Sequence, residues 1–351
     1  MKLTLPLFLR EAWILLIIFL SMLPQIILGQ KNLTLDYSAI DLVSGIKNNP
    51  SDIYLCDSIS KSTSLQLVEL ICHKNESDKP SLKDALSKLS NKKNSQPDYF
   101  LCNNLDSLEC ELTSLINDSK QINPDSLSIS VKKYFPLSDV SQLRTTIFFT
   151  VCGWQWGDAV AFNYSIYDNK CILEGDLNGI MINLQIFLQY ADNNSKRVQI
   201  MKDILKHEIF HIYFAQHAKV NGFSKHQNEF DQLTYIMQNE GIAHFLSLIN
   251  STSDAFFEKH IKSTIQQIDS LLVFLKDPDI SHLEKTERIN RGTYGPFWSK
   301  FICIAGLYTA SKIYENDGIS GLQKSIDAGP EDFFKKYCQY SNQYMQNQTN
   351  N

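Results

Sequence analysis

The string His207-Glu208-Ile209-Phe210-His211 constrains the fold of this chain more than any other stretch. His207 and His211 are four residues apart, so on an α-helix their imidazoles project from one face, within reach of one small ion. Glu208 lies beside them, where a carboxylate can take a proton from a metal-bound water. The string therefore predicts a helix that carries two metal ligands and a base. The alternative is an ordinary helix with two core-facing histidines.

The flanking residues predict a long helix that is buried on the histidine side. Residues 193–195 offer an amino-terminal cap, and the helix is expected to run to about His217. The apolar residues on the stripe of the two histidines are Ile200, Ile204 and Phe214. Both histidines are thus expected to face the protein interior.

A second helix, from about Asn228 to Leu248, supplies a candidate third ligand in Glu240. Glu240 falls on that helix's apolar stripe, where a carboxylate is costly unless a cation meets it. Two His, one Glu and an open position for water form a known catalytic zinc set, so Zn²⁺ is the expected cofactor. Gly241 and Ala243 are small and predict a close approach of the two helices. In the alternative, Glu240 pairs with Lys or Arg or points outward.

Two other histidines compete for the third ligand position. His217 follows His211 by six residues, a spacing known from H-E-x-x-H-x-x-G-x-x-H sites, but Phe214 stands where those sites have glycine. A continuing helix would carry His217 about 9 Å further along the axis. His244 follows Glu240 by one turn and could bind metal, or hydrogen-bond Glu240 or a ligand histidine.

The amino terminus predicts export. Two basic residues, Lys2 and Arg10, precede an apolar run over residues 12–28, which indicates a signal peptide over residues 1–29. The alternative is a membrane anchor formed by residues 12–28. We therefore expect a secreted or extracellular protein, associated with a membrane only if this segment is retained. A net charge of −5 without a basic cluster argues against nucleic acid as a partner.

Eight cysteines, an even number, fit an oxidising compartment. Nearest-neighbour disulfides are predicted as Cys56–Cys72, Cys102–Cys110, Cys152–Cys171 and Cys303–Cys338. Glycosylation sequons, which would suit a glycosylated surface, begin at Asn32, Asn75, Asn117, Asn163, Asn193, Asn250 and Asn347.

The remaining patterns predict an α+β, mostly helical protein. Residues 30–127 are expected to form a helical amino-terminal region, residues 128–340 a catalytic domain, and residues 341–351 a disordered tail. Three β-branched or apolar runs predict a small antiparallel sheet packed on the two helices: Thr145–Val151, Asp158–Asn163 and Gly179–Phe187. Two further helices are expected over residues 297–312 and 318–340.

H-E-I-F-H followed by N-E-G-I-A-H resembles the gluzincin group of metallopeptidases. It is most similar to zinc-dependent peptidase domains that pair an H-E-x-x-H helix with a later E-G-x-A helix. The likeness covers about residues 128–340 and includes Tyr134-Phe135-Pro136 and Gly292-Thr293-Tyr294-Gly295. It implies a zincin-like fold, with His207, His211 and Glu240 as ligands and Glu208 as base. Position 244, often acidic in such domains, is histidine.

These residues predict a zinc metallopeptidase that acts on a peptide or protein substrate. Tyr294, between two glycines, is the candidate donor to the developing oxyanion, and the strand Gly179–Leu184 is expected to pair with an extended substrate. Two alternatives remain: a noncatalytic secreted or surface glycoprotein that keeps a peptidase scaffold for binding, or a zinc hydrolase of a non-peptide bond.

Overall fold

The computed structural model describes residues 33–48, 58, 60–73, 81–87, 100, 105, 108–140, 143–153, 157–224, 226–249 and 252–349. Leu33 to Asn351 cluster as one compact unit. The signal peptide and the alternative anchor fall outside the described residues and stay predictions. Within the described part of the chain, no helix combines the length and apolarity needed to cross a bilayer.

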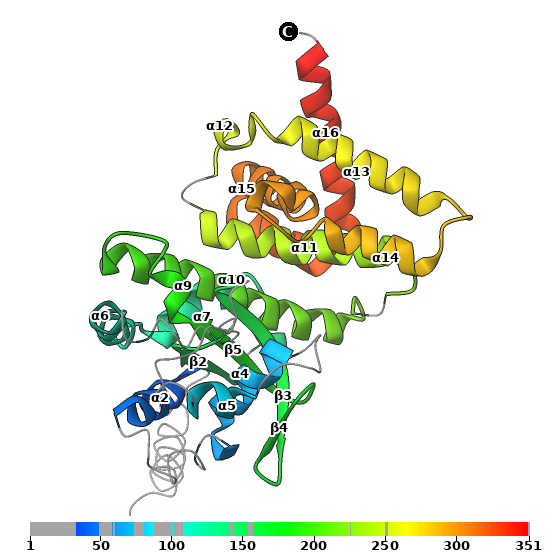
Figure 1. Ribbon diagram of the computed structural model, residues 1–351. Coiled ribbons are helices and arrows are strands. Elements are labelled where there is room, and N and C mark those ends of the chain that lie inside the picture. Colours follow the sequence, from blue (N-terminus) through cyan, green and yellow to red (C-terminus); the bar gives the residue numbers. More distant parts are fainter. Residues whose placement is uncertain are drawn as a thin grey trace, which may run out of the picture. The chain divides into compact units, whose positions relative to one another are not determined.

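A five-stranded mixed sheet forms the core of one half of this unit (Figure 1). Its strand order is β1 (Leu33–Asp36), β2 (Thr145–Thr150), β5 (Leu177–Asn183), β3 (Ala159–Tyr167) and β4 (Lys170–Leu173). β1, β2 and β5 are parallel, whereas β3 runs antiparallel to β5 and β4. The small sheet is confirmed, but its prediction as antiparallel is only half right. A helical crossover lets β1 pair with β2 in parallel, and β3 and β4 separate β2 from β5 along the chain, so these two strands pair in parallel as well.

The position of β5 overturns its expected role in substrate binding. β5 pairs with β2 on one side and with β3 on the other, so its backbone cannot accept another strand. It also ends at Asn183, whose side chain caps the short helix α9 (Leu184–Phe187). In the described part of the chain, the strand with a free edge nearest α10 is β3, which pairs with β4 only from Tyr164 onward.

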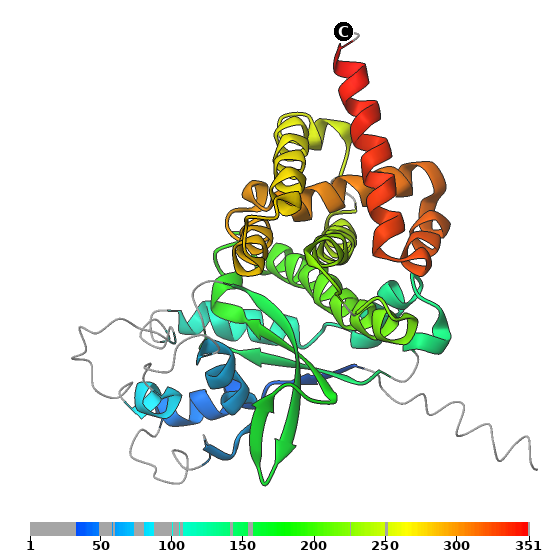
Figure 2. The ribbon, with the colours of Figure 1, turned by 90° about the vertical axis from the view of Figure 1, so that its right-hand side faces the viewer.

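Helices cover both faces of the sheet (Figures 1 and 2). α2 (Ser38–Asn48) and α4 (Thr63–His73) pack on β2 and β4, while α7 (Pro124–Lys132) packs on β1. Burial on both faces explains the nearly continuous apolar runs of the central strands, which include Ile147, Phe149 and Ile180. The other helices before β2 are α5 (Leu82–Ser87), α6 (Glu109–Ser119) and α8 (Leu137–Val140).

The two predicted central helices are confirmed. α10 spans Asn194–Asn221, begins where the Asn193 side chain accepts a hydrogen bond from the Lys196 amide, and ends at Gly222, which has a φ of 79°. α11 spans Glu229–Leu248, and Asn228 caps it in the same way. α10 packs on β3 and α11 packs on α10, so these helices connect the sheet to the helical half.

Helices after α11 form the other half of the unit. They are α12 (Asp254–Phe257), α13 (Ile261–Lys276), α14 (His282–Arg291), the 3₁₀ turn η2 (Phe297–Ser299), α15 (Phe301–Ala328) and α16 (Pro330–Thr349). α15 is interrupted at Gly318, where φ is 62°. The disordered tail predicted from residue 341 is wrong up to Thr349, because the helix α16 continues to that residue (Figure 2). Tyr344 and Met345 pack against the core.

The close helix approach predicted from Gly241 exists, but with another partner. A Cβ at Gly241 would meet the backbone of Gly306 on α15, 2.7 Å from its carbonyl oxygen. α11 and α15 therefore cross in backbone contact, and Gly241 faces α15 instead of α10.

Three of the predicted disulfides are absent. Cys110, Cys171, Cys303 and Cys338 are free thiols, which excludes Cys102–Cys110, Cys152–Cys171 and Cys303–Cys338. The Cys171 thiol instead lies 3.8 Å from the Thr63 carbonyl oxygen, and Cys303 is near Glu240. The predicted pairing of Cys56 with Cys72 stays a prediction, because Cys56 lies outside the described residues.

Candidate metal centre

The structure brings the three predicted ligands together from two helices. Nε2 of His207 and Nε2 of His211 are 2.9 Å apart on α10. The Glu240 carboxylate, on α11, lies 3.7 Å from His207 Nε2 and 3.6 Å from His211 Nε2. All three side chains are largely buried, with exposed fractions of 13%, 17% and 28%. The competing interpretation of Glu240 as an outward-pointing carboxylate is thus excluded.

These separations fit a zinc ion. Ligand atoms about 2.0–2.2 Å from a tetrahedral zinc lie roughly 3.3–3.6 Å from one another. Two of the three separations are within a few tenths of an ångström of that range, and a small side-chain rotation would widen the imidazole pair. Two neutral imidazoles and one carboxylate are also donors that zinc prefers.

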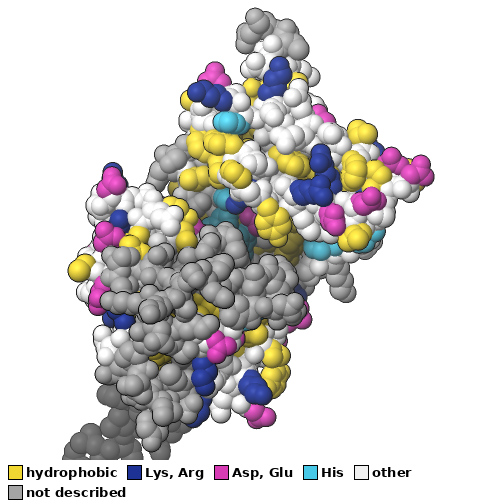
Figure 3. Space-filling model, in the orientation of Figure 1, with side chains coloured by type: hydrophobic (Ala, Val, Ile, Leu, Met, Phe, Trp, Pro, Cys, Tyr) yellow, Lys and Arg dark blue, Asp and Glu magenta, His cyan; other side chains and the backbone are white. Residues whose placement is uncertain are grey.

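One side of the centre is open to a cavity of about 390 Å³. Its lining comes from β3, α10 and α11 and includes Ala161, Phe162, His211, Gln216 and Asn239. Figure 3 shows histidine surface in a hollow between the helical half and the half that contains the sheet. A substrate and a water molecule can thus approach the centre along the side of His211.

Neighbouring groups orient both histidines. Asn239 Oδ1 lies 3.0 Å from His211 Nδ1, and the backbone carbonyl of Ala243 accepts a hydrogen bond from His207. Each ring thereby turns Nε2 toward Glu240, the arrangement that outer partners of metal-binding histidines produce. Burial holds the pKa of His207 well below its ordinary value, so this imidazole is neutral and ready to bind a cation.

Glu208 is poised as a base beside the ligands. It is 9% exposed, and burial raises its pKa to about 7, with a smaller contribution from the charge of Glu240. The charge of His211 and a hydrogen bond from the Ala161 backbone of β3 oppose that rise. A carboxylate whose pKa lies near neutrality is suited to general acid–base work.

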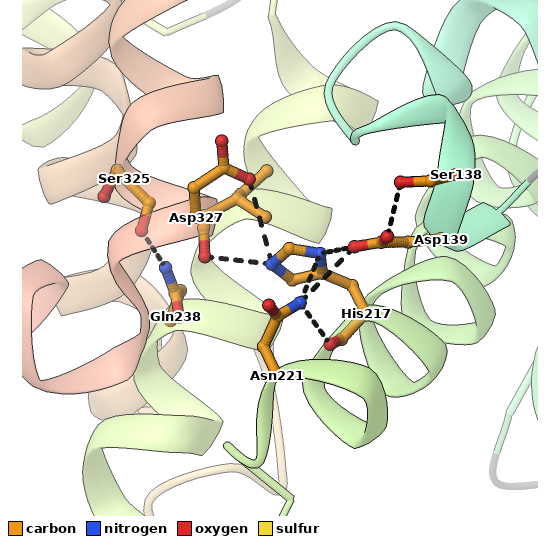
Figure 4. A network of polar contacts seen from close by, with 8 residues as sticks. Ser138, Asp139, His217, Asn221, Gln238, Ser325 and Asp327 are labelled. Atoms are coloured by element: carbon orange, nitrogen blue, oxygen red, sulfur yellow. Dashed lines mark hydrogen bonds and ion pairs between the residues drawn. The ribbon is translucent and has the colours of Figure 1, made fainter.

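His217 is excluded as a ligand because other partners hold it (Figure 4). Its Nδ1 lies 2.8 Å from Asp139 Oδ2, and its Nε2 lies 3.3 Å from the Ile326 carbonyl oxygen. Asn221, at the surface, completes this network, which ties α10 to α8 and α15 around the buried His217. His217 therefore has a structural role.

His244 lies beside the centre. Its Nε2 is 3.9 Å from Glu240 Oε2, and its ring centroid is 4.5 Å from that of His207. Burial lowers the pKa of His244 to about 4, so the ring is neutral.

Tyr294 does not join the other predicted residues. It lies between α14 and η2, and 73% of its side chain is exposed. Its role as an oxyanion donor stays a prediction. The sequence did not point to Asn239, although it directly precedes Glu240, or to Cys303, which is distant along the chain and carries no local signal.

The helix pair, the converging donors and the buried carboxylate define a candidate metallohydrolase site. The chain belongs to the family described as "Putative zinc dependent peptidase (DUF5700)", whose model matches residues 56–344. This confirms the resemblance to zinc-dependent peptidases. A comparison with curated proteins and with solved structures finds no significant match.

Proposed function

We propose that the protein is a zinc-dependent peptidase of gluzincin type, in which His207, His211 and Glu240 hold the metal and Glu208 moves the proton. The observation that carries the proposal is the convergence of these three donors within 3.7 Å of one another, beside a buried carboxyl with a pKa of about 7. Membership of a zinc-dependent peptidase family supports it.

The residues divide the reaction among them. A zinc ion at this centre would acidify a bound water and polarise the scissile carbonyl. Glu208 would accept the proton of that water and then deliver it to the departing amine. Asn239 and Ala243 would hold the imidazoles of His211 and His207 in their metal-binding orientation during both steps.

The cavity beside His211 is the proposed substrate cleft. Between Ala159 and Phe162, β3 has an edge without a strand partner in the described part of the chain, and this stretch faces α10. An extended peptide could add to that edge through backbone hydrogen bonds and so place a carbonyl near the ligands. Export of the enzyme is part of the proposal and rests on the amino-terminal sequence pattern.

Two other functions make different predictions. A binding scaffold needs no base, yet Glu208 is buried, and a buried carboxyl without a function is costly. A hydrolase of a non-peptide bond would use the same metal and base. Only the substrate distinguishes it from a peptidase.

A mixed peptide library tests the proposal. The zinc-loaded protein is expected to cleave peptide bonds, and Glu208→Gln is expected to lose at least about 100-fold in rate, the usual contribution of a general base, while it retains the metal. Glu258→Gln, a change of a carboxylate outside the centre, is the matched control and should leave the rate unchanged. If ester or amide substrates other than peptides are cleaved and the library is not, the non-peptide alternative replaces this proposal. If zinc-loaded protein cleaves neither the peptide library nor the non-peptide substrates, the binding-scaffold alternative replaces this proposal.

A further inference from the structure

A second set of metal-binding side chains adjoins the first. The donor atoms of Glu240, His244 and Cys303 all lie within 4.8 Å of one another. Glu240 and His244 are one turn apart on α11, whereas Cys303 lies in the first turn of α15. Cys303 is 1% exposed, so its thiol points into the protein beside these two residues.

The Glu240 carboxylate is placed to serve both sets. Its Oε1 lies 3.6 Å from His211 Nε2, whereas Oε2 lies 3.7 Å from His207 Nε2 and 3.9 Å from His244 Nε2. Carboxylates commonly bridge two cations in this way in two-metal sites. One oxygen can therefore bind an ion between the α10 histidines while the other binds a second ion on the His244 side.

The His244 ring is fixed in an orientation suitable for binding. It is packed between His207 and Phe297, with ring centroids 4.5 Å and 5.6 Å away. This packing leaves Nε2 directed toward Glu240. A preoriented imidazole loses little conformational freedom when it binds an ion.

Charge and ligand type indicate which ions would bind. Thiolate, imidazole and carboxylate together suit zinc and the softer divalent ions, and oppose magnesium or calcium. The second set contains one carboxylate, Glu240, and one thiol, Cys303, and a thiol that binds a divalent cation releases its proton. The charge of Lys300 acts on both His207 and His244, so it opposes cation binding at both sites.

We propose that Glu240, His244 and Cys303 form a second site for zinc or another thiophilic divalent cation, bridged to the first centre by the Glu240 carboxylate. The site does not depend on peptide hydrolysis, because two of its donors, His244 and Cys303, belong to no part of the proposed reaction.

Cadmium titration of the full-length protein tests the site through two readouts, the number of ions bound per chain and the sulfur-to-cadmium charge-transfer absorption. We expect wild type to bind two ions and to show the band. Cys303→Ser should bind one ion without the band, and His244→Asn should also bind one. Cys338→Ser, which removes another free thiol, is the matched control and should match wild type.

His211→Ala separates the two sites, since it should lose the first ion and keep the band. One ion per wild-type chain with no band overturns the proposal. Loss of the charge-transfer band in His211→Ala would also overturn the proposal, because the Cys303 thiol would then bind the ion of the first centre. If Cys303→Ser fails to fold by circular dichroism, the wild-type stoichiometry, His211→Ala and His244→Asn still decide. Two bound ions without peptide hydrolysis would refute the proposed function and support the second site. Peptide hydrolysis with only one bound ion would support the proposed function and refute the second site.

Discussion

Gly241→Ala tests whether the crossing of α11 and α15 positions the metal centre. A Cβ at this position would lie 2.7 Å from the Gly306 carbonyl oxygen, and ordinary contact requires about 3.4 Å, so the helices must separate by at least about 0.7 Å. Overpacking of this kind costs about 1–3 kcal/mol, and backbone on both sides of the contact places the cost near the upper end. The higher helix propensity of Ala returns about 1 kcal/mol. The expected net loss of unfolding free energy is about 2 kcal/mol.

The same displacement should also weaken metal binding. Glu240 precedes Gly241, and a shift of this size exceeds the tolerance of about 0.5 Å that a functional site allows. We expect zinc affinity to fall about 10–100-fold, as when an outer partner of a metal ligand is lost.

Urea denaturation and competitive zinc titration measure the two effects of Gly241→Ala. Leu322→Ala is the control for destabilisation alone. Leu322 is fully buried in the carboxyl-terminal part of α15, so this change should cost about 2–5 kcal/mol and leave zinc affinity unchanged. Wild-type stability and affinity in Gly241→Ala would refute the description of the helix crossing.

Three further predictions concern groups around the centre. Asn239→Leu removes the partner of His211 Nδ1 and should weaken zinc binding about 10–100-fold in a competition titration, with the fold unchanged by circular dichroism. Burial raises the pKa of Glu208 from 4.5 to about 7, so the folded metal-free protein binds this proton more tightly than the unfolded chain does. The stability of wild type relative to Glu208→Gln should therefore fall as pH rises from about 4.5 to 7. Urea midpoints of the two proteins that differ equally at pH 5 and pH 8 would contradict this. Asp139→Asn should cost about 2 kcal/mol at pH 7 and leave zinc affinity unchanged. The pKa of Asp139 is lowered, chiefly by the Ser138 hydroxyl, so its stabilisation should be present at neutral pH and disappear as pH falls below about 4.

The parts that local signals determine were predictable from the sequence. Asn193 and Asn228 are strong helix caps and Gly222 favours a left-handed stop, so the bounds of α10 and α11 followed closely. Glu240 was identified because a carboxylate on an apolar stripe needs a cation. Both inferences use residues within a few turns of one another.

The parts that depend on distant contacts were not predictable. The parallel pairing of β1 with β2 joins segments more than a hundred residues apart, and no local pattern encodes the direction. Gly241 indicated a close approach without identifying the helix that it meets. Cysteine order along the chain likewise gave no measure of distance, so Cys303 was paired with Cys338 when it lies beside Glu240.

A crystal structure of the zinc-loaded protein, with anomalous diffraction recorded at the zinc edge, tests the central claim most directly. The account predicts an anomalous peak about 2.0–2.2 Å from His207 Nε2, His211 Nε2 and the Glu240 carboxylate, with one coordination position open toward the cavity. No peak between these three side chains, or a peak held by other residues alone, would contradict it.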